Sequence, residues 1–319
     1  MRKVVFSRDI VKPISEPYAG LFKMVFPSSE QELHAEMADA NAFVTVMGTP
    51  VTAELLKHAG PNMKVVGANS AGYDHVDVAA CTRAGLAFLN APKSLAYPTA
   101  ELTLGLIIST MRRIVQEDQK LRKSLNVAFE FLPEKPISLY GKTAGIVGLG
   151  RIGKIVANML RACGMKIAYH DQNRVTSDVE AALEARYLSF NELLEQSDIV
   201  SLHCPYNNEN HHMMNREAFA RMKPNAFFFN IGRGKLMDEA ALIEVLKAGK
   251  IAGAGLDVYE NESAISPELA TFDNVVLSPH VGSGTKETRI GMFRECMDGI
   301  IAILDGKRPE NLINPEVFS

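Results

Sequence analysis

Three polar residues in the second half of the chain have side chains that together could run an acid–base reaction. Arg233, Glu262 and His280 each follow a short apolar run of the kind that forms a buried strand. A guanidinium binds a carboxylate through two parallel hydrogen bonds, an imidazole exchanges a proton near neutral pH, and a nearby carboxylate favours the charged imidazole. Taken singly, each residue is more simply explained as an ordinary loop residue. Taken together, they indicate proton transfer to a substrate that carries a carboxylate.

A glycine-rich turn lies upstream of these residues. Gly148, Gly150 and Gly153 form the pattern G-x-G-x-x-G between an apolar run and a helical pattern, and the next apolar run ends at Asp171. Such glycines permit a tight turn and let the backbone approach a pyrophosphate at the helix N-terminus. An aspartate in this place accepts hydrogen bonds from ribose hydroxyls and repels a 2′-phosphate. The pattern therefore predicts a Rossmann domain that binds NAD, with NADP less favoured, and Arg174 is interpreted as a solvated surface arginine.

Apolar periodicity divides the chain into two series of alternating strands and helices. In the first hundred residues, helical patterns separate three predicted strands, at 3–6, 42–47 and 63–69. A second series starts near residue 143, after two further predicted elements, a long helix over 99–124 and a linker or surface arm over 125–142. A helix over about 285–305 closes the chain. This alternation predicts an α/β protein with two doubly wound parallel-sheet domains.

Composition excludes several other functions. The net charge of −3 and the absence of a long basic run argue against nucleic acid or an anionic membrane surface as a partner. Four widely spaced cysteines indicate reduced thiols, and no apolar run approaches the length of a membrane span or a signal peptide, so a cytoplasmic protein is expected. The histidines around Cys204 match no metal-ligand spacing, and no metal is expected.

Six stretches of the chain resemble the D-isomer-specific 2-hydroxyacid dehydrogenase family. They are NSAGYDHVDVAACTRAG, NAPKSLAYPTAELTLGLI, GKTAGIVGLGRIG, SDIVSLHCP, FFFNIGRGKLMDEAALIEVLKAGKIAGAGLDVYE and NVVLSPHVGSGT. The resemblance extends from about residue 60 to residue 290. It implies a Rossmann NAD-binding domain over 100–286, a flavodoxin-like substrate domain over 1–99 plus 287–319, an active site in the cleft between them, and a homodimer.

The resemblance also implies roles for the three polar residues. Arg233 would bind the substrate carboxylate and polarise its carbonyl, and His280 would act as the acid/base with Glu262 as its partner. Two features depart from the family pattern. Ser263 stands where a proline is common, which leaves Glu260 open as an alternative to Glu262, and the chain has no tryptophan, which leaves the contacts of a dimer arm open.

Further contacts are implied residue by residue. Beyond the glycines and Asp171, the residues expected to contact the cofactor are Arg151, Ile152, Cys204, Pro205, Ile231, Gly232, Asp257 and Gly282. The main-chain amides of Ala71 and Gly72 would hold the substrate carboxylate. Leu95 would overhang the substrate side chain, with Tyr97 in the same loop; the alternative is that both only pack an interdomain hinge.

The expected activity is the NAD-dependent interconversion of a small 2-keto acid and a D-2-hydroxy acid. Glyoxylate, hydroxypyruvate, gluconate-derived keto acids, branched keto acids and 3-phosphoglycerate all remain open, the last as the substrate of a short-form phosphoglycerate dehydrogenase. A different class also remains open, an NAD(H)-sensing binding protein of the same fold that resembles transcriptional corepressors. NADH oxidation against a panel of 2-keto acids separates the two classes.

Overall fold

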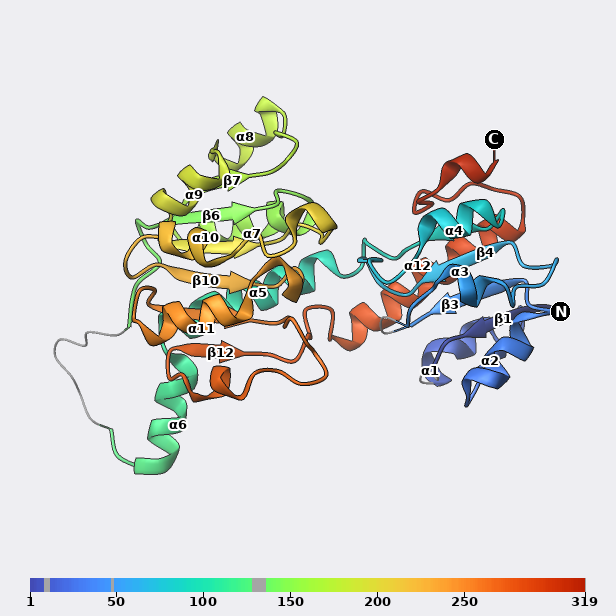
Figure 1. Ribbon diagram of the computed structural model, residues 1–319, viewed down its shortest axis with the longest axis horizontal. Coiled ribbons are helices and arrows are strands. Elements are labelled where there is room, and N and C mark those ends of the chain that lie inside the picture. The colour runs from blue at the N-terminus through green and yellow to red at the C-terminus, as the bar shows by residue number, and fades with distance from the viewer. Residues whose placement is uncertain (9–11, 47–48, 128–135, 319) are drawn as a thin grey trace. The chain divides into compact units, whose positions relative to one another are not determined.

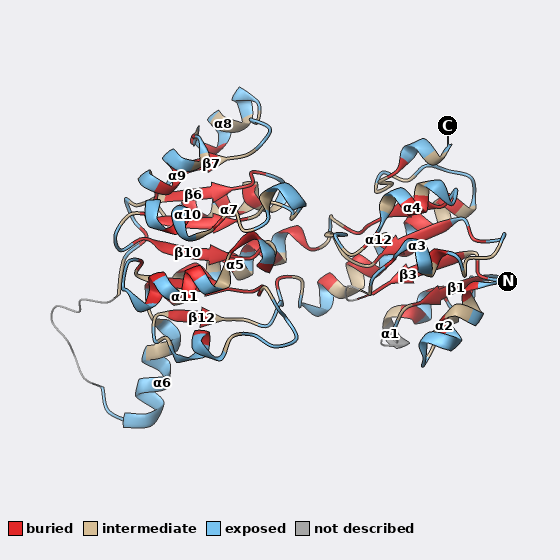
Figure 2. Ribbon diagram, in the orientation of Figure 1, coloured by how far each residue is buried: buried red, intermediate tan, exposed pale blue. Residues whose placement is uncertain are grey.

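The chain forms two compact units in the computed structural model, which describes residues 1–8, 12–46, 49–127 and 136–318. Unit 1 comprises Met1–Leu95 and Thr285–Ser319, and unit 2 comprises Ala96–Gly284. The sequence predicted the boundaries between these units after residues 99 and 286, whereas the structure has them after residues 95 and 284. Each unit has its own sheet, with buried strands and helices that are exposed on their outer faces (Figures 1 and 2).

Unit 1 contains a five-stranded parallel sheet in the order β2-β1-β3-β4-β5. Its strands are β1 (Arg2–Phe6), β2 (Phe22–Val25), β3 (Ala42–Thr45), β4 (Val65–Ala68) and β5 (Ala87–Leu89). Its helices are α1 (Lys12–Ser15), α2 (Glu30–Met37), α3 (Ala53–Leu56), α4 (Val78–Arg83) and α12 (Lys286–Leu304). β1, β3, β4 and β5 are almost wholly buried, as expected when helices cover both faces of a parallel sheet. The order is that of flavodoxin-like folds.

Unit 2 contains a seven-stranded parallel sheet in the order β12-β11-β10-β9-β6-β7-β8. Its strands are β6 (Thr143–Val147), β7 (Lys166–His170), β8 (Ala185–Tyr187), β9 (Ile199–Leu202), β10 (Phe227–Asn230), β11 (Gly253–Leu256) and β12 (Val275–Leu277). The chain builds outward from β6 to β8 and then returns to the other side of β6 with β9. The point between β6 and β9 is therefore the topological switch, where doubly wound sheets bind ligands at the carboxyl ends of their strands.

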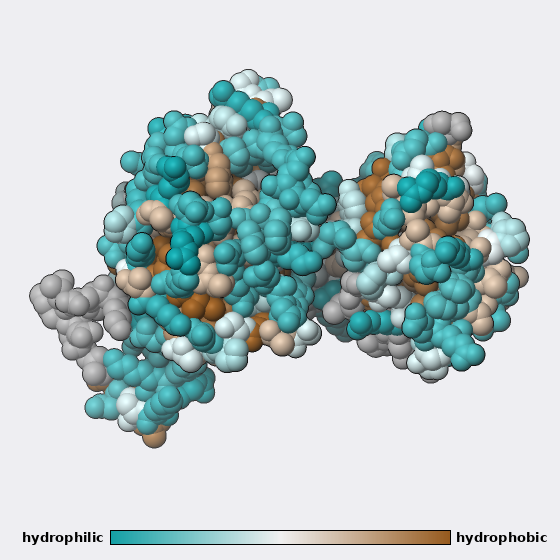
Figure 3. Space-filling view, viewed as in Figure 1, coloured by the Kyte–Doolittle hydropathy of each residue, from teal (hydrophilic) through white to brown (hydrophobic). Residues whose placement is uncertain are grey.

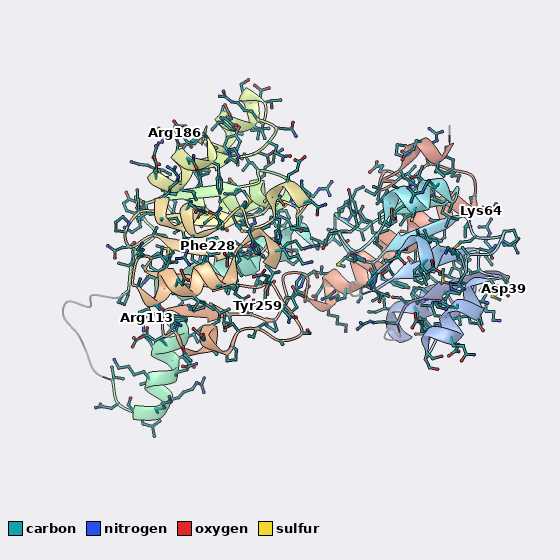
Figure 4. The ribbon with its side chains drawn as sticks, in the orientation of Figure 1. Asp39, Lys64, Arg113, Arg186, Phe228 and Tyr259 are labelled. Carbon is teal, nitrogen blue, oxygen red and sulfur yellow. The ribbon has the colours of Figure 1, made fainter. Side chains whose placement is uncertain are left out.

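Helices cover the sheet of unit 2 and bury its aromatic strand residues. The covering helices are α5 (Ala96–Met111), α7 (Arg151–Ala162), α8 (Ser177–Leu183), α9 (Phe190–Gln196), α10 (Arg216–Arg221) and α11 (Glu239–Lys247), and a further helix, α6 (Ile114–Ser124), has no buried residue. Phe228 on β10 is completely buried beneath them (Figure 4). The visible surface of both units is largely hydrophilic (Figure 3). The two-sheet α/β fold expected from the sequence is thus confirmed.

The prediction of one long helix over 99–124 is wrong in one respect, because the structure has two helices in this range. α5 ends at Met111 and α6 begins at Ile114, because Arg113 between them takes a left-handed conformation with φ of 56°. The Arg113 guanidinium also donates to Asp273 at 3.0 Å. The strand predicted over 42–47 ends at Thr45, and Met47 lies outside the described residues. Part of the arm predicted over 125–142, residues 128–135, also lies outside them.

None of the helices in the described ranges is both long enough and apolar enough to pass through a bilayer.

Candidate active site

Three loops leave the same edge of the unit 2 sheet and carry the acid–base residues. β10, β11 and β12 are neighbours and run parallel, so their carboxyl ends meet at one edge. Arg233 follows β10, Asp257 and Glu262 follow β11, and His280 follows β12. The alternation of strands and helices brings residues far apart in sequence to one place.

His280 and Glu262 form a direct pair. The Nδ1 atom of His280 lies 2.8 Å from one carboxylate oxygen of Glu262 and 2.9 Å from the other. Both side chains are nearly half exposed, at 46% and 47%, so the pair is reachable by a ligand. Glu260 points to a different partner, His212 Nε2, at 2.7 Å. Of the two acids left open by the sequence, Glu262 is the one in contact with His280.

Asp257 anchors the loop that carries His280. The carboxylate of Asp257 is 1% exposed and accepts hydrogen bonds from the amides of Val281 and Gly282, both at 2.9 Å, and from the Ser278 hydroxyl. His280 takes a left-handed conformation with φ of 51°, which is unfavourable for a residue with a Cβ and persists where surrounding contacts impose it. The bonds to Asp257 supply such contacts on both sides of the histidine.

Tyr259 fastens the loops after β11 and β12 to each other. Its hydroxyl donates to the carbonyl oxygen of Ser278 at 2.8 Å, and burial raises the pKa of Tyr259 to about 12. The residue is labelled in Figure 4. Because Tyr259 lies between Asp257 and Glu262 in the chain, this bond ties the segment of Glu262 to the segment of His280.

Arg233 is held by the turn in which it lies. The side chain of Asn230, which is fully buried, donates to the carbonyl oxygen of Arg233 at 2.9 Å and accepts from the amide of Gly232 at 3.1 Å. One guanidinium nitrogen of Arg233 donates to the Gly232 carbonyl at 2.9 Å. The arginine is half-buried, and a guanidinium presents its N–H donors in a planar fork that suits a carboxylate.

The glycine-rich turn has the shape that a pyrophosphate requires. Gly148 takes φ of 92°, and a Cβ at Gly153 would lie 2.1 Å from the Gly148 carbonyl oxygen, so neither position admits a side chain. A Cβ at Gly150 would meet nothing within 4 Å. Gly150 is also the N-cap of α7 and gives that helix no side-chain cap. Open space over an uncapped twelve-residue helix fits the phosphates of a dinucleotide.

Asp171 lies beside this turn and helps to hold it. One carboxylate oxygen accepts from the amide of Leu149 at 2.8 Å and the other from the amide of Asn173 at 3.0 Å. Each oxygen has a second lone pair, so the carboxylate can still accept hydrogen bonds from a ribose. Asp171 is half-buried at the end of β7, on the strand that neighbours β6.

Arg174 is exposed, as interpreted from the sequence, and its side chain also takes part in an ion pair. Its guanidinium makes two hydrogen bonds to Glu180, at 2.8 and 3.0 Å, and lies over the Tyr187 ring at 5.4 Å. Hydrogen bonds from Arg174 and from the Tyr169 hydroxyl lower the pKa of Glu180 to about 2. The arginine is therefore committed to a structural ion pair.

Of the remaining expected cofactor residues, Cys204 lies against the glycine-rich turn and Gly232 lies against Cys204. A Cβ at Gly148 would lie 2.5 Å from the amide nitrogen of Cys204, and a Cβ at Gly232 would lie 3.2 Å from the Cys204 carbonyl oxygen. Burial raises the pKa of the Cys204 thiol to about 12, so it is not a thiolate at neutral pH. Arg151 and Ile152 occupy the first turn of α7, Pro205 follows Cys204, Ile231 is buried after β10, and Gly282 lies against Asp257.

The expected substrate residues Ala71, Gly72 and Leu95 belong to unit 1. Ala71 and Gly72 follow β4, where the Ser70 hydroxyl donates to the Gly72 carbonyl oxygen at 2.7 Å. Leu95 is 7% exposed at the end of the loop after β5, whereas Tyr97, in the first turn of α5, is 64% exposed. Within the described ranges, the structure groups no three histidine, cysteine or acidic side chains as a metal would require.

Sequence reasoning missed Asn230, Tyr259 and the anchoring contacts of Asp257. Asn230 could have been found, because a buried amide at the end of an apolar strand needs partners for all of its polar atoms. Tyr259 gave no comparable signal, because its partner Ser278 lies in the loop after a different strand, β12.

The geometry of unit 2 defines the class of protein, an α/β dehydrogenase with its dinucleotide turn at the topological switch. Within that class the chain belongs to the D-isomer-specific 2-hydroxyacid dehydrogenase family: the model of that family's NAD-binding domain matches residues 104–282.

Individual relatives of the chain agree with this membership. The chain is 39% identical over 295 residues to a glyoxylate reductase of Thermococcus onnurineus, covering 91% of this chain and 88% of the relative. A D-lactate dehydrogenase of Aquifex aeolicus, solved with NAD and lactic acid, is 29% identical with a TM-score of 0.84, covering 95% and 96% of the two chains. An NADPH-dependent glyoxylate/hydroxypyruvate reductase of Sinorhizobium meliloti, solved with NADP and malonate, is 29% identical with a TM-score of 0.87, covering 98% and 96%.

The chain is therefore an oxidoreductase that interconverts 2-keto acids and 2-hydroxy acids with a nicotinamide dinucleotide. This confirms the fold, the family and the reaction class expected from the sequence.

Proposed function

We propose that the enzyme reduces glyoxylate or a similarly small 2-keto acid with NADH, using His280 as the proton donor. The contact between His280 Nδ1 and Glu262 carries the proposal. Because Nδ1 faces a carboxylate, Nε2 is the nitrogen left to exchange a proton with a substrate. The sequence identity of 39% to a glyoxylate reductase supports glyoxylate as the first substrate to test.

Each side chain has a defined part in the reduction. A bound reduced nicotinamide supplies a hydride to the carbonyl carbon. Protonated His280 gives its Nε2 proton to the carbonyl oxygen, which becomes the hydroxyl, and Glu262 stabilises the imidazolium before the transfer. Arg233 binds the carboxylate and, by its positive charge, favours the negative charge that develops on the carbonyl oxygen. In the oxidising direction, neutral His280 takes the hydroxyl proton.

The main-chain amides of Ala71 and Gly72 are proposed to bind the substrate carboxylate, and Leu95 to contact the substrate side chain. An apolar residue in that place suits a small substrate without a charged group, which favours glyoxylate over a phosphorylated keto acid. Leu95 is buried in unit 1, so it offers an apolar boundary and no hydrogen bond.

NAD is proposed as the cofactor in preference to NADP. Asp171 places a negative charge beside the turn, which disfavours a 2′-phosphate. The cation nearest in sequence, Arg174, is bound by Glu180 through two hydrogen bonds, so accepting a phosphate would require it to leave that carboxylate.

A homodimer through α6 is also proposed. None of the α6 residues is buried, and Ile114 and Leu121 are 49% and 48% exposed. Leu125 and Val127, which follow the helix, are 87% and 84% exposed. Clustered exposed apolar side chains of this kind mark interaction surfaces.

NADH oxidation by the purified enzyme against glyoxylate, hydroxypyruvate, branched 2-keto acids and phosphohydroxypyruvate tests the proposed function. Glyoxylate should give the highest kcat/KM, and His280→Ala should lower kcat by a factor of about 10² to 10⁴ while the Kd for NADH stays within about twofold. Tight NADH binding without turnover of any keto acid would instead favour an NAD(H) sensor. Full turnover by His280→Ala would remove the histidine from the mechanism.

A further inference from the structure

Asn90, at the end of β5, connects the loop after β4 to the C-terminal segment of the chain. Its side-chain nitrogen Nδ2 donates to the carbonyl oxygen of Ala71 at 2.7 Å. The side chain of Asn311 donates to the carbonyl oxygen of Asn90 at 2.6 Å, and the amide of Asn90 donates back to the carbonyl oxygen of Asn311 at 3.4 Å. Asn90 is 5% exposed. Its main chain is thus fixed from one side while its side chain holds a loop on the other.

In the loop that Asn90 holds, the carbonyl groups of residues 70–72 accept hydrogen bonds, whereas two main-chain amides donate none to any described residue. The Ser70 carbonyl accepts from the amide of Ala91 at 2.9 Å, the Ala71 carbonyl accepts from Asn90, and the Gly72 carbonyl accepts from the Ser70 hydroxyl. Among the residues that the structure describes, neither Ala71 nor Gly72 donates its N–H to an acceptor. The contacts of this loop therefore fix its peptide planes through their oxygens and leave adjacent N–H groups for a ligand.

Further contacts hold the C-terminal segment that binds Asn90 against the end of β5. The C-terminal segment continues along the edge of β5, with Leu312 opposite Leu89 in an antiparallel bridge and the amide of Ile313 donating to the Phe88 carbonyl at 2.8 Å. On the other side of Asn90, the carboxylate of Glu295 in α12 accepts from the amide of Lys93 at 3.0 and 3.2 Å. Elements from the last part of the chain hold the end of β5 on both sides.

We propose that Asn90 is a positioning residue for 2-keto acid binding, and that Asn311 holds it in place. The side chain of Asn90 fixes the Ala71 carbonyl, and this sets the conformation in which the amides of Ala71 and Gly72 are available to a carboxylate. The inference rests on the proposed function, because the carboxylate is that of the keto acid. Asn90 does not touch the substrate; it acts through the loop.

Asn314 provides a matched control for a purely structural role. It belongs to the same C-terminal segment, is 1% exposed, and binds the β5 edge by accepting from the amide of Phe88 at 2.6 Å and donating to the carbonyl of Leu86 at 3.0 Å. Its side-chain hydrogen bonds go to Phe88, Leu86 and Thr82, none of which belongs to the loop after β4. A loss of stability alone should therefore affect variants of Asn90 and Asn314 alike.

Asn90→Asp keeps the size of the side chain but places a carboxylate oxygen against the Ala71 carbonyl. We expect the KM for glyoxylate to rise at least tenfold, with kcat changed by less than threefold and the Kd for NADH unchanged. The reason is that the carboxylate is then bound more weakly in the substrate complex and in the transition state alike. Asn314→Asp should lower the urea midpoint without changing this KM. If Asn90→Asp does not fold, Asn311→Ser tests the same connection, with an expected threefold rise in KM.

A KM within twofold of the wild type in a folded Asn90 variant would overturn the proposal, as would an equal rise in Asn314→Asp. Amide exchange at Ala91, whose N–H donates to the Ser70 carbonyl, gives a readout that does not depend on turnover. It should quicken in Asn90→Asp and stay unchanged in Asn314→Asp. If the wild type reduces no keto acid, the proposed function fails, and unchanged exchange at Ala91 in Asn90→Asp would separately refute the role of Asn90.

Discussion

Nδ1 of His280 lies within 2.9 Å of both carboxylate oxygens of Glu262, while Glu260, two residues earlier, binds His212. The two glutamates thus have separate partners, although they leave the same strand. Tyr259, which precedes both glutamates, donates to the Ser278 carbonyl and holds this segment beside the loop of His280. The chain then turns at Glu262 and Ser263, and Glu262, not Glu260, reaches the histidine. This arrangement makes the contribution of Glu262 directly measurable.

Glu262→Gln should lower kcat for keto acid reduction at neutral pH by about 10- to 100-fold, within the range typical of general acid catalysis. Loss of the negative charge removes the partner that favours the imidazolium, which is the form that donates the proton. Steady-state kcat at neutral pH measures this loss. Glu260→Gln is the control and should keep the wild-type kcat; a wild-type kcat in Glu262→Gln would exclude a role of Glu262 in supporting His280.

Glu180→Gln should improve the use of NADPH. Without its carboxylate partner, the guanidinium of Arg174 becomes available to a 2′-phosphate, and we expect kcat/KM for NADPH to rise about three- to tenfold with little change for NADH, a gain of about 1 kcal/mol as for an exposed charged contact. Glu184, at the end of α8, pairs with Arg161 at 2.7 Å. Glu184→Gln should therefore have no effect on cofactor choice, and equal effects of the two variants would disprove the role of the Arg174 pair.

His203, after β9, should make the protein sensitive to mild acid. Burial lowers the pKa of His203 to about 4 from an ordinary value near 6.5, and its Nε2 lies 2.9 Å from the Ser201 hydroxyl. The unfolded chain binds the proton first as pH falls, so stability is lost between pH 6.5 and about 4, with no further contribution below that.

Urea unfolding followed by circular dichroism at a series of pH values measures this loss. The slope of stability against pH between 6.5 and 4 should be shallower in His203→Gln than in the wild type. The exposed His211 in the following loop is the control, and His211→Gln should keep the wild-type slope. A wild-type slope in His203→Gln would show that other groups cause the acid sensitivity.

Leu121→Glu should weaken the proposed dimer, because it places a charge among the exposed apolar residues of α6. Sedimentation velocity should show a shift from dimer to monomer at micromolar concentration, with the circular dichroism spectrum unchanged. Lys120→Gln, one position away on the same exposed helix, should remain dimeric. A monomeric wild type, or a dimeric Leu121→Glu, would contradict the use of this surface.

Much of the fold and of the site could be predicted, because it depends on local patterns. Alternating apolar runs and helical periods gave the two parallel sheets, and the glycine spacing gave the turn before α7. The carboxyl ends of neighbouring strands then had to bring Arg233, Glu262 and His280 to one edge. Each of these inferences needs only the order of elements and the geometry of parallel sheets.

What escaped prediction depends on contacts between distant segments. The break between α5 and α6 occurs at Arg113, where no glycine or proline marks it, and Arg113 binds Asp273 from another part of the chain. Asp257 was expected beside the cofactor, and its spacing gave no indication that its carboxylate binds the amides of Val281 and Gly282. The ion pair of Arg174 escaped prediction for the same reason, since its partner Glu180 lies on the next helix.

The division of unit 1 into two stretches of chain has a consequence for synthesis on the ribosome. β4 and β5 are made before unit 2, but α12, which packs on them, and the segment that borders β5 are made after unit 2. At about 5–20 residues per second, the intervening chain takes roughly 10–40 s to make. Unit 2, which is continuous, can fold during this interval, whereas the apolar side of β4 and β5 stays uncovered. Nascent chains halted before Lys286 should therefore depend on chaperones that shield the N-terminal sheet.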